Sequence, residues 1–193
     1  LIFDEVKTGF RLSNGGARET YGVIPDISTY AKSLGNGIPV AAFGGKSEVM
    51  NVIGGGSVAH AGTFGGNGVS MSAANTVLDI LNETPVLKNL SLRGKRLKEG
   101  MDKILSEENL PHQMCGHPNI QGFLITENKV QDVRDLAHSD DAMYEKIMDH
   151  MFDRGIWVES DPREPWFLCA SHTEEIIDET LNIFQDSVQA AIK

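Results

Sequence analysis

The sequence predicts an α/β fold, and three patterns lead to this prediction. Short apolar runs bounded by acidic or glycine-rich segments recur along the chain, and buried strands give such runs. Longer stretches carry apolar residues at helical spacing. After Pro111 we expect strand, helix, strand and helix within about 80 residues, which is typical of a small α/β layer.

The first part of the chain is expected to hold three short strands. The apolar run at its start indicates the end of a buried strand, with Asp4 and Glu5 at the carboxyl end. The second strand ends just before Lys32, and a Gly-Asn-Gly turn follows. We expect strands at residues 1–3, 27–31 and 39–44, an ordered loop at 8–22, a turn at 35–37 and a short helix at 46–53.

Long helices and a second α/β layer are expected after a flexible glycine joint at residues 54–56. The first long helix begins near Asn67 and is broken by Pro85. Thr173 is expected to cap the last helix, whose first turn is acidic and suits the helix dipole. Trp157 and Trp166 are expected to fill a core. The other expected elements are a helix at 87–105, strands at 120–126 and near 166–170, and helices at 140–154 and 173–192.

Composition disfavours several classes of protein. The formal net charge of −10 repels phosphate backbones, so nucleic-acid binding is not expected. Cys115 and Cys169 are too few for a disulfide framework and indicate reduced thiols in a cytoplasmic protein. No stretch approaches the roughly 20 apolar residues of a membrane helix, and no signal peptide is visible.

Asp4 and Lys32 are the first candidates for chemistry. An acid at the carboxyl end of a buried strand lies where α/β folds place their ligand crevices, although a turn or cap aspartate gives the same pattern. A lysine that closes a buried strand is expected to be partly desolvated, which favours the neutral amine that Schiff-base chemistry needs. The alternative is a lysine that reaches into solvent from a strand end.

Other segments carry weaker signals. Thr63 lies among glycines ahead of a helix, where a hydroxyl and backbone N–H groups can bind phosphate. Arg163 is a candidate for a substrate carboxylate, and a surface ion pair with Asp161 or Glu164 is an equal alternative. The H-x-x-C-x-H pattern at residues 112–117 has no evident fourth ligand, so we expect a surface loop and no metal site there.

In combination these segments resemble the class III aminotransferases, enzymes of fold type I that use pyridoxal 5'-phosphate (PLP). The motifs are LIFDEV at residues 1–6, TGFR at 8–11, PD at 25–26, AKSLGNG at 31–37 and GT at 62–63. GGA at 15–17 and ASHTE at 170–174 are most similar to the glutamate-1-semialdehyde aminomutase-like branch. The resemblance implies that residues 1–83 form the later part of the large PLP-binding domain and residues 84–193 a small α/β C-terminal domain.

The resemblance also implies residue roles. Asp4 matches the acid that pairs with the pyridine nitrogen, and Val6 the apolar residue packed on the ring. Lys32 matches the Schiff-base lysine, which also moves protons as a general acid and base. Thr63 matches the threonine that reaches the phosphate of the neighbouring subunit's cofactor, which implies a homodimer with shared active sites. Glu5 is expected to anchor the loop below the cofactor.

The implied activity is transfer of an amino group between an amine donor and a keto acid or aldehyde. An aminomutase, which shifts the amine within one molecule, would use the same residues. The family's phosphate-binding loop and stacking aromatic lie upstream of the aspartate motif and are not present here. We therefore expect a fragment of a chain about twice as long, which holds PLP poorly, and a non-catalytic remnant is a third hypothesis.

Overall fold

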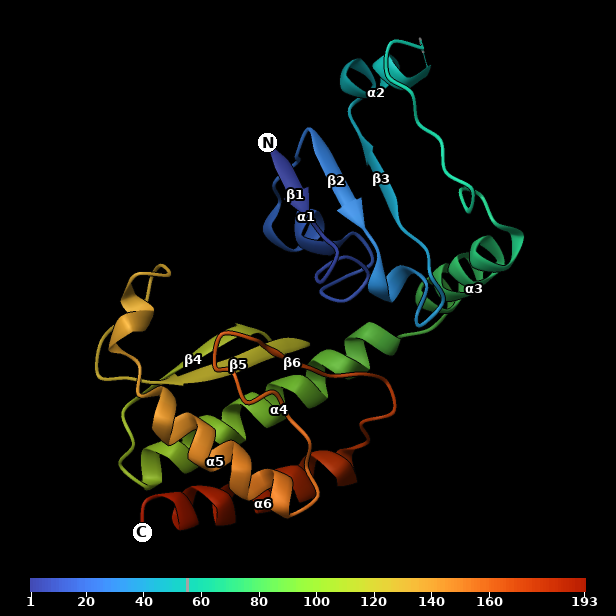
Figure 1. Ribbon diagram of the computed structural model, residues 1–193. Helices are drawn as coiled ribbons and strands as arrows, with labels where there is room; N and C mark the ends of the chain where they lie inside the picture. The colour runs from blue at the N-terminus through green and yellow to red at the C-terminus, as the bar shows by residue number, and fades with distance from the viewer. Residues whose placement is uncertain (55) are drawn as a thin grey trace. The chain divides into compact units, whose positions relative to one another are not determined.

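The computed structural model describes residues 1–54 and 56–193 (Figure 1). The chain forms two compact units, Leu1–Leu87 and Lys88–Lys193. Each unit combines a three-stranded sheet with helices, so the expected α/β class is confirmed. Gly55, within the expected glycine joint, lies outside the described residues. No helix in the described part of the chain is long and apolar enough to cross a membrane.

The sheet of the first unit has the strand order β1-β2-β3. Strand β1 is parallel to β2, with Asp4 opposite Thr29, whereas β2 is antiparallel to β3. Parallel strands end at the same edge of a sheet, so the residues that follow β1 and β2 leave from one edge. The strands are β1 (Ile2–Asp4), β2 (Ile27–Tyr30) and β3 (Ala42–Gly45).

The helices of the first unit largely follow the sequence pattern. Asn67 begins α3 as predicted, because its side chain accepts hydrogen bonds from the N–H groups of Val69 and Ser70. The expected loop at 8–22 was wrong in part, since it contains α1, which is too short to show helical periodicity. The elements are α1 (Gly16–Tyr21), the 3₁₀ turn η1 (Lys32–Leu34), α2 (Ser47–Gly54) and α3 (Gly68–Glu83).

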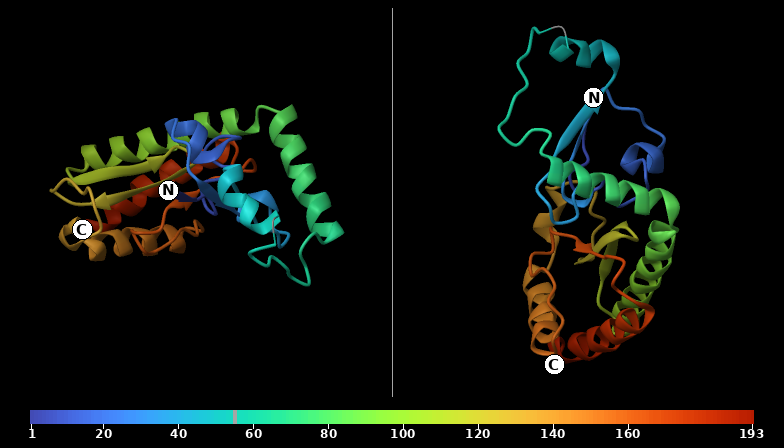
Figure 2. Two further views of the ribbon diagram at one scale, coloured as in Figure 1. Left: turned by 90° about the horizontal axis from the view of Figure 1, so that it is seen from above. Right: turned by 90° about the vertical axis from the view of Figure 1, so that its right-hand side faces the viewer.

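The second unit is a helix layer against an antiparallel sheet of order β4-β5-β6. Figure 1 shows helices α4, α5 and α6 together on one side of this sheet, and the views in Figure 2 agree. The elements are α4 (Val86–Glu107), β4 (His112–His117), β5 (Ile120–Ile125), η2 (Asp135–His138), α5 (Asp141–Asp153), β6 (Trp166–Phe167) and α6 (Glu174–Ala191).

Aromatic side chains join the sheet to these helices. The Phe123 ring of β5 lies 5.0 Å from Tyr144 of α5 and 5.4 Å from Phe184 of α6, measured between ring centroids. Trp166 is buried as predicted, but Trp157 is 88% exposed, so its assignment to the core was wrong. Trp157 follows α5 in a segment without regular structure, and its large apolar side chain was not enough to predict burial.

Two hydroxyl groups of the second unit, those of Thr173 and Tyr144, make well-defined hydrogen bonds. Thr173 caps α6 as expected, with its hydroxyl accepting from the Ile176 N–H.

The Tyr144 hydroxyl accepts a hydrogen bond from the Trp166 indole and donates to the Glu159 carbonyl, both at 3.1 Å. Burial raises the pKa of Tyr144 to about 12, because the phenolate would lose its hydration.

Tyr144→Phe should therefore destabilise the second unit by about 1–3 kcal/mol at neutral pH, because the buried Trp166 indole N–H and Glu159 carbonyl lose their partner. Denaturant unfolding measures this change. Tyr21→Phe is the matched control, since Tyr21 is 64% exposed, and it should change little.

The pH dependence follows from the same hydroxyl. The unfolded chain ionises Tyr144 near its ordinary pKa of 10, whereas the folded chain keeps the proton until about 12. This contribution to stability is fully present below pH 10 and is lost as the pH rises toward 12, at no more than about 1.4 kcal/mol per pH unit. The alkaline slope of unfolding free energy should be shallower in Tyr144→Phe, and identical slopes would contradict this account.

Candidate functional site

The carboxyl edge of β1 and β2 brings two predicted site residues to one end of the first sheet. Asp4 is the last residue of β1, and Lys32 follows the end of β2 by two residues. Because Asp4 is paired with Thr29 in parallel register, both chains leave the sheet in the same direction. This edge is where open α/β sheets bind ligands.

Asp4 uses only one of its carboxylate oxygens within the described chain. Its Oδ1 accepts from the Val6 N–H at 3.0 Å and from the Thr29 hydroxyl at 3.4 Å. Its Oδ2 accepts no hydrogen bond from any described residue, and the side chain is exposed. Asp4 is thus a turn aspartate through Oδ1 and retains Oδ2 as an acceptor for a further donor.

Lys32 begins η1 in a backbone conformation that lysine rarely adopts. Its φ is 44°, in the left-handed region, which costs about 1 kcal/mol for a residue with a side chain. The N–H groups of Gly35 and Asn36 donate to the Lys32 carbonyl at 3.1 and 2.9 Å and hold this turn. The expected partial desolvation of the Lys32 side chain was wrong, because Lys32 is exposed and no residue in the described part of the chain buries it.

Lys46 provides a contrast within the same sheet. It follows β3, which runs antiparallel to β2, so it lies near the opposite edge. Its ammonium lies 2.7 Å from the Asp26 carboxylate, and this hydrogen bond raises the pKa of Lys46. No described carboxylate forms such a pair with Lys32.

Val6 and Thr63 occupy different positions relative to this edge. Val6 is half-buried directly beyond Asp4, and its main-chain N–H donates to the Asp4 carboxylate. Thr63 is exposed in a turn that the Gly65 N–H and Gly62 carbonyl close at 2.9 Å. No hydrogen bond in the described part of the chain joins Thr63 to Asp4 or Lys32. Two N–H groups in the first turn of α3, those of Val69 and Ser70, are not open to phosphate, since the Asn67 side chain accepts from them.

Glu5 anchors the loop after β1, as expected. Its side chain is 1% exposed. Its carboxylate accepts from the Thr8 hydroxyl and the Ala17 N–H, both at 2.8 Å, and from the Arg18 N–H at 3.3 Å. A Cβ at Gly16 would overlap this carboxylate, and Gly16 also has a positive φ of 65°.

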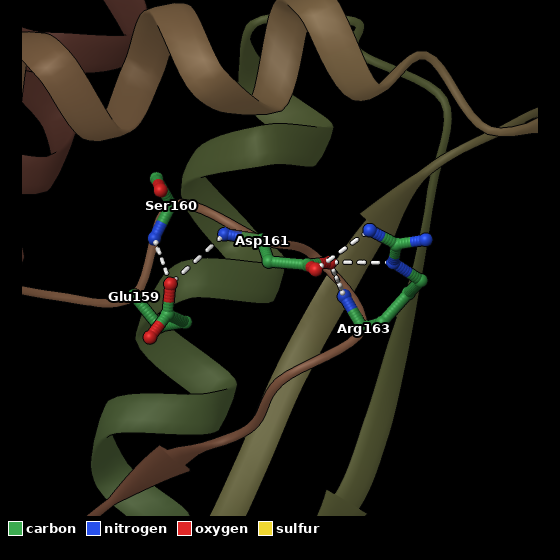
Figure 3. Close-up of polar contacts among 4 residues, drawn as sticks. All are labelled: Glu159, Ser160, Asp161 and Arg163. Carbon is green, nitrogen blue, oxygen red and sulfur yellow. Dashed lines mark hydrogen bonds and ion pairs between the residues drawn. The ribbon is translucent and has the colours of Figure 1, made fainter.

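Arg163 belongs to the second unit, in the segment before β6. Figure 3 shows its guanidinium facing Asp161, with Nε and Nη2 each 2.7 Å from a carboxylate oxygen. The Arg163 N–H also donates to Asp161 at 2.9 Å, and the Glu159 carboxylate supports the turn by accepting from the Ser160 and Asp161 N–H groups. This hydrogen bonding lowers the pKa of Asp161 and raises that of Arg163. The ion pair with Asp161 that the sequence left open is present.

The expectation of a surface loop at residues 112–117 was wrong, because they form β4. Alternation along a strand places His112 on the opposite face from Cys115 and His117. The His112 ring contacts the Leu110 carbonyl at 2.8 Å and the Asp102 carboxylate at 3.0 Å. Burial, followed by the charge of Lys98, lowers the pKa of His117. No cluster of three or more metal-binding side chains occurs among residues 1–54 and 56–193.

Sequence reasoning missed Thr29 as a partner of Asp4. Its hydroxyl donates to Asp4 from the neighbouring strand, 25 residues away in sequence. Only the strand register could have predicted this contact. A threonine within an apolar strand does not by itself indicate a hydrogen bond, because threonine is common in strands for packing reasons.

A family model described as aminotransferase class-III matches residues 1–188. The glutamate-1-semialdehyde 2,1-aminomutase of Alkaliphilus oremlandii is 38% identical over 190 residues, covering 97% of this chain and 44% of the relative. The enzyme of the same name from Aquifex aeolicus is 37% identical, covering 98% of this chain and 45% of its own.

Solved structures give the same result for the fold. An omega-transaminase from Sphaerobacter thermophilus matches with a TM-score of 0.86 at 27% identity, covering 100% of this chain and 44% of that one. A β-phenylalanine aminotransferase from Variovorax paradoxus matches with a TM-score of 0.83 at 27% identity, covering 98% and 44%.

The chain thus spans slightly less than half the length of the relatives it matches. The expected resemblance, including its aminomutase-like branch and its fold type, is confirmed by these matches. Because the family model covers nearly all of the sequence, the chain belongs to the class-III aminotransferase family.

Proposed function

We propose that this chain carries the lysine and the acid of a PLP-dependent aminotransferase site. The observation that supports this most is the parallel pairing of β1 with β2, which sends Asp4 and Lys32 to one sheet edge. The two side chains fit the cofactor, because PLP requires a primary amine for its carbonyl carbon and a hydrogen-bond acceptor for its protonated ring nitrogen. Lys32 offers the first and Asp4 Oδ2 the second.

Each residue would have a distinct task. Asp4 Oδ2 would accept from the ring N–H and keep that nitrogen protonated. Lys32 Nζ would hold the cofactor covalently and, once displaced, move a proton as a general acid and base. Val6 would lie against the ring. The cofactor, when bound, supplies the electron sink that makes the substrate's α-carbon acidic.

The assembly and location remain part of the proposal. Thr63 is exposed, as a residue that reaches a partner subunit's cofactor phosphate would be, which supports a homodimer with shared sites. Residues 1–83 would be the later part of a large PLP-binding domain and residues 84–193 a small domain. The reduced-thiol composition, with Cys115 and Cys169 both free, favours a cytoplasmic location.

The substrates proposed are a small amine donor and a keto acid or aldehyde acceptor. Arg163 is the proposed contact for a substrate carboxylate. Asp161 already occupies its Nε and Nη2, so a substrate would have to use the remaining Nη1 edge or displace Asp161. We therefore propose a weak carboxylate preference at this position.

An aminomutase is the second candidate, supported by relatives of that name that are 37% and 38% identical. A non-catalytic piece is the third, supported by the 44% coverage of the relatives. Asp4 and Lys32 serve both reactions equally and cannot separate them.

PLP capture tests the proposal directly. The purified protein is incubated with PLP, fixed with borohydride and mapped by peptide mass spectrometry. We expect Lys32 to carry at least about fivefold more cofactor than exposed lysines away from this edge, such as Lys88, because Lys32 leaves the sheet at the edge that holds Asp4. Lys32→Ala should remove this excess. Equal labelling of Lys32 and residues such as Lys88 would overturn the assignment.

Two control variants separate selective from random labelling. Lys46→Ala should leave the excess at Lys32 unchanged, because Lys46 is paired with Asp26 near the opposite edge. Asp4→Asn should reduce it, since an amide does not keep the ring nitrogen protonated.

The reaction type is tested with an amine donor in the presence and absence of a keto acid. We expect sustained turnover only when both are present, because without an acceptor each bound cofactor can take up one amino group and the reaction then stops. Isomerisation of one amino aldehyde without any acceptor would instead assign the aminomutase reaction.

A further inference from the structure

We propose that Glu5 is a positioning residue that holds the Asp4 carboxylate in the direction the site requires. The importance of that direction rests on the proposed function, whereas the mechanical link between the two residues does not. Glu5 is buried and Asp4 exposed, although they are adjacent. A buried carboxylate is retained only where hydrogen bonds replace its hydration.

The Glu5 side chain ties the end of β1 to α1. Its Oε2 accepts from the Thr8 hydroxyl and the Ala17 N–H, and its Oε1 from the Arg18 N–H. Two of these donors are main-chain groups, so the position of the carboxylate depends on the path of the loop rather than on a flexible side chain. The carboxylate therefore fixes how the loop returns after β1.

The Glu5 backbone carries this restraint to Asp4. The Glu5 N–H donates to the Thr29 carbonyl at 2.9 Å and extends the pairing of β1 with β2. The Glu5 carbonyl accepts from the Gly9 N–H at 2.8 Å. That carbonyl and the Val6 N–H belong to one planar peptide unit, so holding the first fixes the direction of the second. The Val6 N–H in turn holds Asp4 Oδ1 at 3.0 Å.

Thr29 completes the arrangement from the other strand. Its carbonyl receives the Glu5 N–H and its hydroxyl donates to Asp4 Oδ1. Asp4 Oδ1 is thus held from two directions, both of which depend on Glu5 remaining in register. The consequence is a fixed direction for Asp4 Oδ2, the oxygen assigned to the cofactor.

Gly16 provides the space that this arrangement needs, because a Cβ there would overlap the Glu5 carboxylate. Glu19 of α1, the helix that begins at Gly16, offers a matched comparison with Glu5. It accepts from the Gly15 N–H at 2.8 Å but is exposed and lies outside the chain of contacts to Asp4. Glu19→Gln is therefore the control for removing a loop-capping carboxylate.

The first test measures amide hydrogen exchange at Val6 by NMR, without cofactor. Glu5→Gln should speed this exchange at least about tenfold while amides of β5 in the second unit stay unchanged. Glu19→Gln should leave Val6 as in the wild type. If Glu5→Gln does not fold, Thr8→Val removes one hydrogen bond only and should give a smaller increase. A Val6 exchange rate unchanged in the folded Glu5 or Thr8 variant overturns the proposal.

The second test asks whether Glu5 acts through Asp4 on PLP capture at Lys32. Asp4→Asn and Glu5→Gln are each expected to weaken the apparent PLP affinity about tenfold. The double variant should be no weaker than Asp4→Asn alone, because Glu5 has nothing left to position. A loss of about a hundredfold, the product of the single losses, would show that Glu5 acts independently of Asp4 and contradicts the proposal.

The outcomes also separate this inference from the proposed function. If wild-type protein captures no PLP selectively at Lys32, the proposed function fails. The Val6 exchange rates then still decide whether Glu5 holds Asp4.

Discussion

The parallel pairing of β1 with β2 is the constraint on which the candidate site depends. Its register sets Asp4 against Thr29 and lets both strands end at one edge. Two residues that are 28 positions apart in sequence, an acid and an amine, then leave the sheet on the same side. A slip of one residue would turn the Asp4 side chain to the other face of the sheet and separate it from the Thr29 hydroxyl.

The segments after the two strands are held by different means. After β1, the buried Glu5 carboxylate and the peptide that follows it restrain the chain through hydrogen bonds. After β2, Lys32 adopts a left-handed backbone conformation that two following N–H groups stabilise. Such strain persists only where the surroundings determine it, and it is common at functional sites. Arg163, by contrast, is held within its own turn by Asp161.

The sequence predicted what depends on local pattern. The apolar strands, the start of α3 near Asn67, the Thr173 cap and the helix break at Pro85 are all determined by neighbours in sequence. It did not predict α1, because six residues show no period and this helix is held from a distance by Glu5. The sequence also did not predict β4. Its polar residues are typical of a loop, and they form a strand because they pair with β5.

The site was predicted in part for the same reason. Asp4 and Lys32 could be named from motifs, but the Thr29 contact and the occupation of Arg163 by Asp161 needed the register and the turn geometry. The exposure of Lys32 also differs from the expectation, since burial of one side chain depends on every residue that could cover it.

A crystal structure with PLP bound to the protein tests the central claim most directly. The account predicts electron density continuous from Lys32 Nζ to the cofactor, with the ring nitrogen about 2.7–3.0 Å from Asp4 Oδ2. Cofactor bound elsewhere, or Asp4 and Lys32 side chains directed into separate regions, would contradict it.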